Sequence, residues 1–307
     1  MSSVLDFKDI ELSDKEWADP LLAVSDYRAT EYCFTTLYIW AGMFGTRIAR
    51  YGNRLFIRSD GDDGGLNYIF PAGNGDIPET LDIIEEDAAA NGKKFTLWAI
   101  ADVKEKVEAA APGRYLFTPV RRSFDYVYGT GDMISLTGKK YQPKRNFISR
   151  FKTQNPDWTY ESICPDGDPG LCRRQIEECM VMTDEWCALN GCIHNESMQM
   201  EACAVRKALE DFVPLRLCGG MLRCGGRLVA YTLGEQLCSD TFIVHVEKAF
   251  SDVTGAYPMI NRTFLETEAA GLKYVNREDD AGDEGLRKAK LSYHPAFMLE
   301  KYLAVRR

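Results

Sequence analysis

The segment Arg50-Tyr51-Gly52-Asn53-Arg54-Leu55 returns later in the chain as Arg223-Cys224-Gly225-Gly226-Arg227-Leu228. Each copy contains a Gly-Asn or Gly-Gly pair, and such residues readily take the positive φ angles of a two-residue hairpin turn. The repeat therefore predicts that the same strand–turn–strand unit is built twice.

A helix with the same start and end signals follows each hairpin. The first predicted helix takes Pro78 early and ends before Gly92, and the second takes Pro258 early and ends before Gly271. Proline suits the first turn of a helix and glycine suits the position after the last turn. A β-rich run follows each helix, so we expect two related α+β domains.

The chain has 307 residues, which is enough for two domains with ordinary cores. We expect the boundary at Gly129-Thr130-Gly131, with an N-terminal domain over residues 1–130 and a C-terminal domain over residues 131–307. The net charge of −9 excludes a protein that coats nucleic acid or anionic lipid with its whole surface, so a polyanion would have to meet a local basic patch.

The ten cysteines and three histidines do not have the spacing of a metal site, and no Cys-x-x-Cys pair occurs. We therefore predict no metal and interpret cysteines such as Cys179, Cys218 and Cys238 as buried thiols. No signal peptide is recognised, and the longest uncharged stretch, residues 32–46, is too short to span a bilayer. These features together predict a soluble, cytoplasmic protein.

The order of elements after the second hairpin is strand, loop, helix and strand. This is the order of the GNAT acyltransferase fold, in which a central strand splays away from its neighbour and lets an acyl donor lie between them. Backbone N–H groups at such a place stabilise a tetrahedral oxyanion. In this chain the splayed strand is expected at residues 240–250, and the helix is expected to start near Pro258.

Four stretches carry a family resemblance: Gly219-Gly220-Met221 with Gly226-Arg227-Leu228-Val229-Ala230-Tyr231, Val244-His245-Val246-Glu247-Lys248-Ala249, Gly255-Ala256-Tyr257-Pro258-Met259-Ile260-Asn261, and Tyr274-Val275-Asn276-Arg277-Glu278-Asp279-Asp280. With them the chain resembles the C-terminal region of phosphatidylglycerol lysyltransferases and their bacterial relatives, over nearly its whole length and most closely over residues 131–303. This resemblance implies a tandem GNAT fold, which the internal repeat predicts independently.

The resemblance also implies an activity, namely transfer of an aminoacyl group from charged tRNA to an amine or hydroxyl acceptor. No cofactor is implied beyond the activated donor. The lipid-modifying members carry a multi-span membrane region ahead of this module, and this chain lacks one, which argues against a lipid acceptor. The oligomeric state stays open.

Two alternatives remain at this stage. The first is an acyl-CoA-dependent N-acyltransferase, although residues 252–257 place an aspartate where such enzymes have Gln or Arg and a tyrosine where they have a small residue beside the pyrophosphate. The second is a non-catalytic small-molecule-binding protein with the same fold. Residues 71–76 of the first half also lack a basic residue, so we interpret that half as the degenerate, structural copy.

Glu247 and His245 are the candidate catalytic residues. By the alternation of a strand, both share one face with Ile243. Glu247 is interpreted as a general base or as a carboxylate that binds the substrate amino group, with a salt bridge to Lys248 or a nearby arginine as the alternative. His245 is interpreted as a proton relay, with a core histidine as the alternative. Lys248 is placed with the substrate-binding residues.

Asn276, Glu278 and Asp279 close the next strand and are the other candidates for substrate binding, because carboxylates there suit an α-amino group. The alternative is a solvated acidic turn, since Asp280 continues the charge run.

Lys144 and Arg145 lie in a stretch of six cations between Asp132 and Asp157 that contains no acid. They are predicted to hold the donor's phosphates, with Gly255 and Ala256 at the start of the later helix. An exposed charged helix face is the alternative.

Overall fold

Both copies of the repeated hairpin form in the computed structural model, which describes residues 5–61, 64–165 and 167–307. Strand β2 (Arg47–Tyr51) pairs with β3 (Arg54–Asp60), and β9 (Cys218–Cys224) pairs with β10 (Arg227–Cys238). The turn glycines have positive φ angles, as the sequence predicts. No helix of the described residues is both long and apolar enough to cross a membrane.

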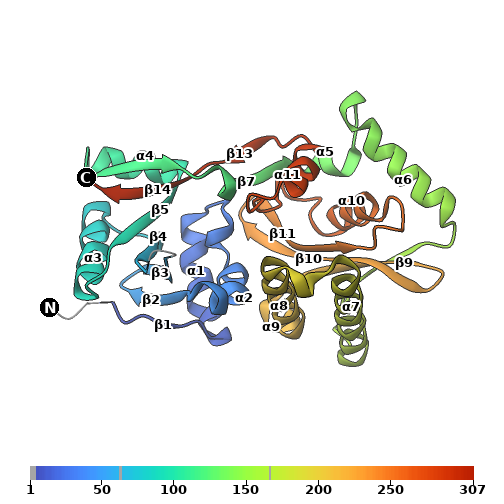
Figure 1. Cartoon of the computed structure of the whole chain (residues 1–307), viewed down its shortest axis with the longest axis horizontal. Helices are drawn as coiled ribbons and strands as arrows, with labels where there is room; N and C mark the ends of the chain where they lie inside the picture. The colour runs from blue at the N-terminus through green and yellow to red at the C-terminus, as the bar shows by residue number, and fades with distance from the viewer. Residues whose placement is uncertain (1–4, 62–63, 166) are drawn as a thin grey trace. The chain divides into compact units, whose positions relative to one another are not determined.

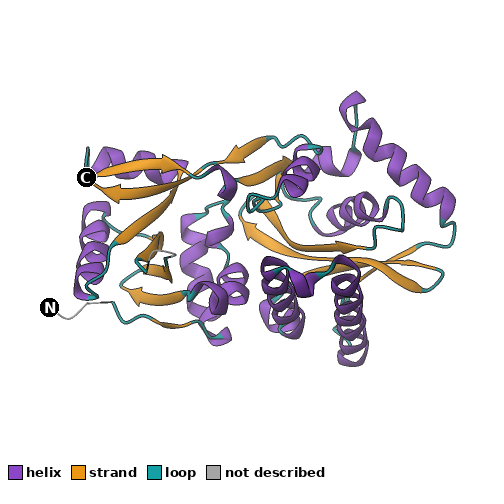
Figure 2. Ribbon diagram, in the orientation of Figure 1, coloured by secondary structure: helices purple, strands orange, loops and turns teal. Residues whose placement is uncertain are grey.

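The chain divides into two compact units. The first contains residues 1–126, 278–287 and 297–307, and the second contains residues 127–277 and 288–296. Figure 1 labels their elements, and Figure 2 separates helices from strands by colour.

The first unit is built on a sheet with the strand order β1-β2-β3-β4-β5-β14-β6. Helix α1 contacts β3 and β4 and lies across the sheet from α3 (Figure 1). Besides β2 and β3, its elements are β1 (Lys8–Asp9), α1 (Lys15–Ser25), the 3₁₀ turn η2 (Thr30–Tyr32), α2 (Phe34–Phe44), β4 (Leu66–Gly73), α3 (Ile77–Ala90), β5 (Phe95–Ile100), α4 (Ala101–Ala110), β6 (Tyr115–Pro119), β13 (Phe297–Leu299) and β14 (Lys301–Arg306).

The second sheet has the order β13-β7-β12-β11-β10-β9-β8. Helices α5, α6 and α10 cover one face of the second unit, and α7 and α8 cover the other (Figure 1). Besides β9 and β10, the elements are β7 (Asp125–Gly129), α5 (Thr130–Ser135), α6 (Gln142–Gln154), β8 (Thr159–Ser162), α7 (Pro169–Asn190), α8 (Glu196–Glu210), α9 (Phe212–Leu215), β11 (Thr241–Ala249), α10 (Ala256–Glu268), β12 (Tyr274–Asn276) and α11 (Glu284–Leu291).

The two sheets repeat one topology. Each has a run of antiparallel strands followed by a parallel pair, β4 with β5 and β11 with β12, and a helix, α3 or α10, joins the members of that pair. The predicted fold class, two GNAT-like α+β domains with mixed sheets flanked by helices, is confirmed.

The domain limits differ from the expected division at residue 130. Strand β14, from the end of the chain, pairs with β5 and β6 in the first unit, and β7, which ends the first half, pairs with β12 in the second unit. Each unit therefore takes one strand from the other half of the sequence. The hairpin repeat could not reveal this, because strand pairing at such separation leaves no local pattern.

The expectation that the cysteines are thiols is wrong at two positions. Cys164, before α7, and Cys172, in the first turns of that helix, form a disulfide, with Cα atoms 4.5 Å apart. Cys179 and Cys238 are buried thiols, as expected, whereas Cys218 is half-buried.

Candidate functional site

The parallel pairing of β11 with β12 ends early. Residues 241–243 of β11 pair with residues 274–276 of β12, but β11 continues to Ala249 while still paired with β10. We call residues 244–249 the splay of β11. This is the feature expected of the fold, and Glu247 lies within it.

Glu247 is fixed at both carboxylate oxygens. Its Oε1 accepts a hydrogen bond from Nη2 of Arg277, at 3.0 Å, and its Oε2 accepts one from Nδ2 of Asn261, at 2.7 Å. The side chains of Glu247 and Arg277 are only 11% and 13% exposed. Arg277 follows β12 and Asn261 comes from α10, so these three residues join the elements on both sides of the splay. Of the two salt bridges considered for Glu247, the one with a nearby arginine therefore forms, and that arginine is Arg277.

Asn261 also brings an unpaired acceptor to Glu247. The residue is 1% exposed, and its Oδ1 has no hydrogen-bond partner among the described residues. Glu247 determines the orientation of the amide, because the reverse orientation would place Oδ1 against a carboxylate oxygen. A buried acceptor without a donor costs about 1–3 kcal/mol, which a bound ligand can return.

Lys144 faces the same cluster from α6. Its Nζ lies 2.7 Å from Oγ of Ser292 and 3.8 Å from the ring centroid of Tyr293. The guanidinium of Arg277 lies over the Tyr293 ring as well, at 5.1 Å, and over that of Tyr128, at 6.0 Å. The two cations thus share the Tyr293 ring, and Arg277 connects it to the Glu247 carboxylate.

Burial and these charges shift the pKa values of the cluster. Burial, with a further contribution from Arg277, lowers the pKa of Lys144 to about 8, and Glu247 opposes this. Burial lowers the pKa of Arg277, but the combined effect of Glu247, Tyr128 and Tyr293 outweighs burial, and the net pKa is raised. Burial raises the pKa of the Tyr293 hydroxyl. Arg277 is therefore a permanent cation, whereas Lys144 can lose its proton in mildly alkaline solution.

His245 does not join this cluster, which corrects the shared-face prediction. The register of β11 against β10 shifts at His245, because Leu233 pairs with Val246 and Gly234 with Val244. Such a β-bulge changes the phase of the alternation. Nε2 of His245 lies 3.1 Å from Oε1 of Glu235, and the histidine side chain is 1% exposed. This buried environment agrees with the alternative interpretation, in which His245 is a core histidine.

Lys248 is also directed away from Glu247. Its Nζ donates to Oε1 of Glu201 on α8, at 2.7 Å, and lies 3.7 Å from the ring centroid of Trp186 on α7. Lys248 therefore belongs to the face that α7 and α8 cover, and the substrate-binding role predicted for it stays a prediction.

The residues that close β12 separate from one another. Asn276 is fully buried in the sheet, opposite Ile243, whereas Glu278 and Asp279 belong to the first unit. Glu278 has a φ of 57°, and Oδ1 of Asp279 accepts from the N–H of Ala281 at 2.9 Å. The backbone of Glu278 and the carboxylate of Asp279 therefore shape the turn after β12.

The alternative interpretation of this segment is a solvated acidic turn. It is wrong for Asp280, because the side chain of Asp280 is 0% exposed. Its carboxylate accepts hydrogen bonds from Arg287, at 2.9 and 3.0 Å, and from the Tyr126 hydroxyl, at 2.6 Å.

The predicted phosphate-binding positions are largely occupied by internal contacts. Arg145 donates to the carbonyls of Leu136 and Gly138. The N–H of Ala256 donates to the carbonyl of Val253, at 3.1 Å. Gly255 has a φ of 85°, and a Cβ there would lie 2.3 Å from the carbonyl oxygen of Phe147 on α6. Gly255 is thus needed for the close approach of α6 to the start of α10.

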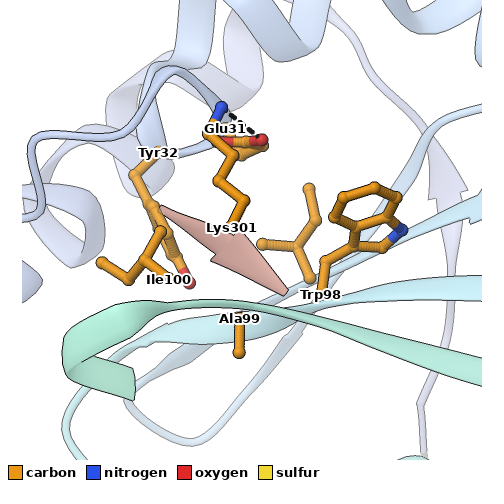
Figure 3. A pocket seen from close by; sticks show the side chains of 7 residues that line it. Glu31, Tyr32, Trp98, Ala99, Ile100 and Lys301 are labelled. Carbon is orange, nitrogen blue, oxygen red and sulfur yellow. Dashed lines mark ion pairs between the residues drawn. The ribbon is translucent and has the colours of Figure 1, made fainter. Parts of the chain in front are cut away.

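In the first unit, side chains fill the place that corresponds to the splay of β11. Strand β4 pairs with β5 only over residues 66–69 and then continues to Gly73. The hydroxyl of Tyr32 donates to the carbonyl of Phe70, at 2.9 Å, in this unpaired part. Lys301 lies beside it and pairs with Glu31 (Figure 3), with Nζ at 2.7 Å, and the same Nζ lies 2.6 Å from Asp125. The cavity that remains is about 10 Å³, which is room for about one water molecule.

Sequence reasoning found Glu247 but missed its partners. Asn261 and Arg277 both lie within the stretches that carry the family resemblance, and this resemblance is the signal that could have identified them. Lys144 was singled out as a cation, but its contacts with Ser292 and Tyr293 join residues about 150 positions apart and have no sequence signal.

Comparison with known proteins places this geometry in a family. The family model described as phosphatidylglycerol lysyltransferase, C-terminal, matches residues 23–305. The crystal structure of a conserved protein of unknown function from Bacteroides thetaiotaomicron is 38% identical, with a TM-score of 0.91, and the match covers 99% of this chain and 100% of that one.

Two further solved structures are similar in fold alone. The C-terminal domain of a candidate lysylphosphatidylglycerol synthetase from Agrobacterium fabrum has a TM-score of 0.65 at 16% identity, with 96% of this chain and 92% of that chain covered. The structure of L-PGS from Bacillus licheniformis has a TM-score of 0.65 at 15% identity, with 95% and 92% covered.

A curated relative is matched over part of its length. An uncharacterised protein of Mycoplasmoides gallisepticum is 25% identical over 185 residues, which is 59% of this chain and 56% of that protein. The chain thus spans little more than half of this relative.

Proposed function

Because the chain belongs to the phosphatidylglycerol lysyltransferase C-terminal family, we propose that it is an aminoacyltransferase. It moves an aminoacyl group from an activated ester, charged tRNA, to an amine or hydroxyl acceptor, and the reaction takes place at the splay of β11.

The observation that carries this proposal is the pair of acceptors at Glu247 and Asn261. A carboxylate has about four lone-pair sites, so Glu247 can still accept hydrogen bonds beside those from Arg277 and Asn261. Oδ1 of Asn261 has no partner among the described residues. An ammonium group offers three N–H donors and would satisfy both, whereas a plain acetyl group offers none. The site therefore favours an acyl group that carries an amine.

The chemistry assigned to the splay is ester aminolysis or transesterification. The aminoacyl ammonium binds to Glu247 and Asn261, which fixes the ester carbonyl beside the backbone of β11. Backbone N–H groups of residues 244–249 then stabilise the oxyanion that forms when the acceptor attacks. Positioning of the reactants and stabilisation of the oxyanion are the contributions to rate that an acyltransferase needs most.

The donor's phosphates are assigned to exposed cations near α6. Arg145 is bound to backbone carbonyls and Lys144 faces Glu247, so neither is suited to the role first predicted for it. Four exposed side chains of the same stretch remain for a polyanion: Lys139, Lys140, Arg150 and Lys152. A contact of this kind weakens as salt rises.

The test is transfer of a radiolabelled amino acid from a mixture of charged tRNAs to protein, amine or lipid acceptors. We expect Glu247→Gln to lower kcat/KM by about 10²-fold, because an ammonium loses its charged partner. Glu266→Gln, an exposed residue of α10, is the matched control and should leave the rate unchanged. Full activity in Glu247→Gln would remove that residue from the site.

Calorimetry with CoA and acetyl-CoA separates the alternatives. Micromolar binding of either would favour the acyl-CoA-dependent N-acyltransferase. Binding of an amino acid amide, without turnover of any charged tRNA, would favour the non-catalytic binding protein.

A further inference from the structure

Lys144 is the ionisable side chain of the cluster to which the proposed transfer has not given a role. It projects from the first turn of α6, with Nζ 2.7 Å from Oγ of Ser292 and 3.8 Å from the centre of the Tyr293 ring. Among the described residues, no carboxylate forms an ion pair with this amine.

Burial and Arg277 disfavour the charged form of Lys144, and the opposing effect of Glu247 is smaller. Arg277, after β12, contributes a permanent cation, and Glu247, on β11, contributes a carboxylate that is already paired with Arg277. Tyr293 contributes an aromatic ring whose hydroxyl stays neutral, because burial raises its pKa. Burial and Arg277 together lower the pKa of Lys144 to about 8, so a large fraction of this amine is neutral in mildly alkaline solution.

Glu247 is less suited to take a proton from a nucleophile. Both of its oxygens already accept hydrogen bonds, and a proton bound there would break the ion pair with Arg277. We propose that Lys144, and not Glu247, accepts the proton of the nucleophile that attacks the aminoacyl ester. This role rests on the proposed function of the splay.

The step balances without a further reactant. The acceptor nitrogen or oxygen forms a bond to the ester carbonyl carbon, and its proton passes to the neutral Nζ of Lys144. The bond from that carbon to the ribose oxygen of the donor then breaks, and the protonated Lys144 returns the proton to this leaving oxygen. Ser292 is a positioning residue, because its hydroxyl oxygen accepts from Nζ and directs the amine.

The first experiment measures Lys144 without any substrate. Acetic anhydride labels only neutral amines, and the labelled fraction of each lysine can be followed against pH by peptide mass spectrometry. We expect a midpoint about 2 pH units lower for Lys144 than for the exposed control Lys93, whose midpoint should be near ~10.4. Equal midpoints for the two lysines would overturn the proposal and leave the proposed function untouched.

The second experiment measures transfer from charged tRNA against pH. Because the neutral amine is the active form, the wild-type rate should rise with pH and level off above about 8. Lys144→Met should lower kcat by about 10²-fold and remove this rise, with little change in the donor KM. Lys144→Arg should not restore the rate, since a guanidinium stays protonated. Lys93→Met is the control.

Ser292→Ala keeps the proposal testable if Lys144→Met fails to fold. Loss of an acceptor that stabilises the ammonium should move the rise in rate to lower pH, and a merely structural serine would leave the profile in place. An unchanged profile in Ser292→Ala, or a wild-type profile in Lys144→Met, would refute the role of Lys144. If the wild type transfers no aminoacyl group, the proposed function fails and the proton-acceptor role fails with it.

Discussion

At the scale of single residues, the molecule uses buried charges in two different ways. Glu247 keeps spare acceptor sites and an unsatisfied neighbour in Asn261, so its pairing with Arg277 leaves room for a ligand. Asp280 accepts from several donors of the first unit, namely Arg287, Arg121, the Tyr126 hydroxyl and the N–H of Gly282. A saturated carboxylate stabilises the fold, whereas an unsaturated one is suited to binding.

The lowered pKa of Asp280 predicts how the free energy of unfolding changes at low pH. Burial opposes the effect, but the hydrogen bonds from Arg287 and Tyr126 hold the pKa of this carboxyl well below its usual value. Its folded pKa is thus lower than its unfolded pKa, so the stabilisation is complete above the unfolded value of about 3.9 and is lost as pH falls through the folded value.

Asp280→Asn should therefore lower the free energy of unfolding by about 1–3 kcal/mol at pH 7 and reduce its dependence on pH below about 4. Chemical denaturation at several pH values measures this. Asp283→Asn, in the same turn but exposed, is the control. A wild-type dependence on pH in Asp280→Asn would contradict this account.

At the scale of the elements, the splay depends on how α10 and α6 are held. Gly255 stands before α10 with a φ of 85°, at a place where a Cβ would lie 2.3 Å from a backbone oxygen of α6. That contact keeps Lys144 on α6 and Asn261 on α10 at one site. The backbone of a single glycine thus sets the distance between two of the proposed functional side chains.

Gly255→Ala should consequently destabilise the fold by about 1–3 kcal/mol, since alanine is strained at positive φ and the neighbouring backbone must move. Gly131→Ala, in α5, has nothing within 4 Å of the added Cβ and should be neutral or slightly stabilising. Thermal unfolding of both variants measures the difference, and equal midpoints would contradict the packing argument.

At the scale of the whole molecule, each sheet contains one strand from the other half of the sequence. Strand β14 pairs on both sides in the first sheet, with β5 and with β6, although it is the last strand of the chain. It also carries Lys301, whose ammonium pairs with Glu31 and Asp125. The first unit is therefore complete only when the end of the chain is in place.

A chain that ends at Glu300 should lose hydrogen-exchange protection throughout β5 and β6, because the N–H and C=O groups that faced β14 are left unpaired. It also leaves the buried Asp125 and the half-buried Glu31 without their cation, and an unpaired buried charge costs about 3–5 kcal/mol in comparable cases. A chain that ends at Arg306 keeps β14 and is the control. Unchanged protection in the shorter chain would show that β14 is dispensable.

The sequence by itself determined the repeated hairpins, the helices that follow them, the tandem fold and the position of Glu247 on the central strand. These depend on turn chemistry, helix ends and residue order, which act over a few neighbouring residues. Only the tertiary structure decided that Arg277 pairs with Glu247, that a bulge separates His245 from it, and that Lys248 faces α7 and α8. Strand register and burial arise from contacts between residues far apart in the chain, so no local pattern records them.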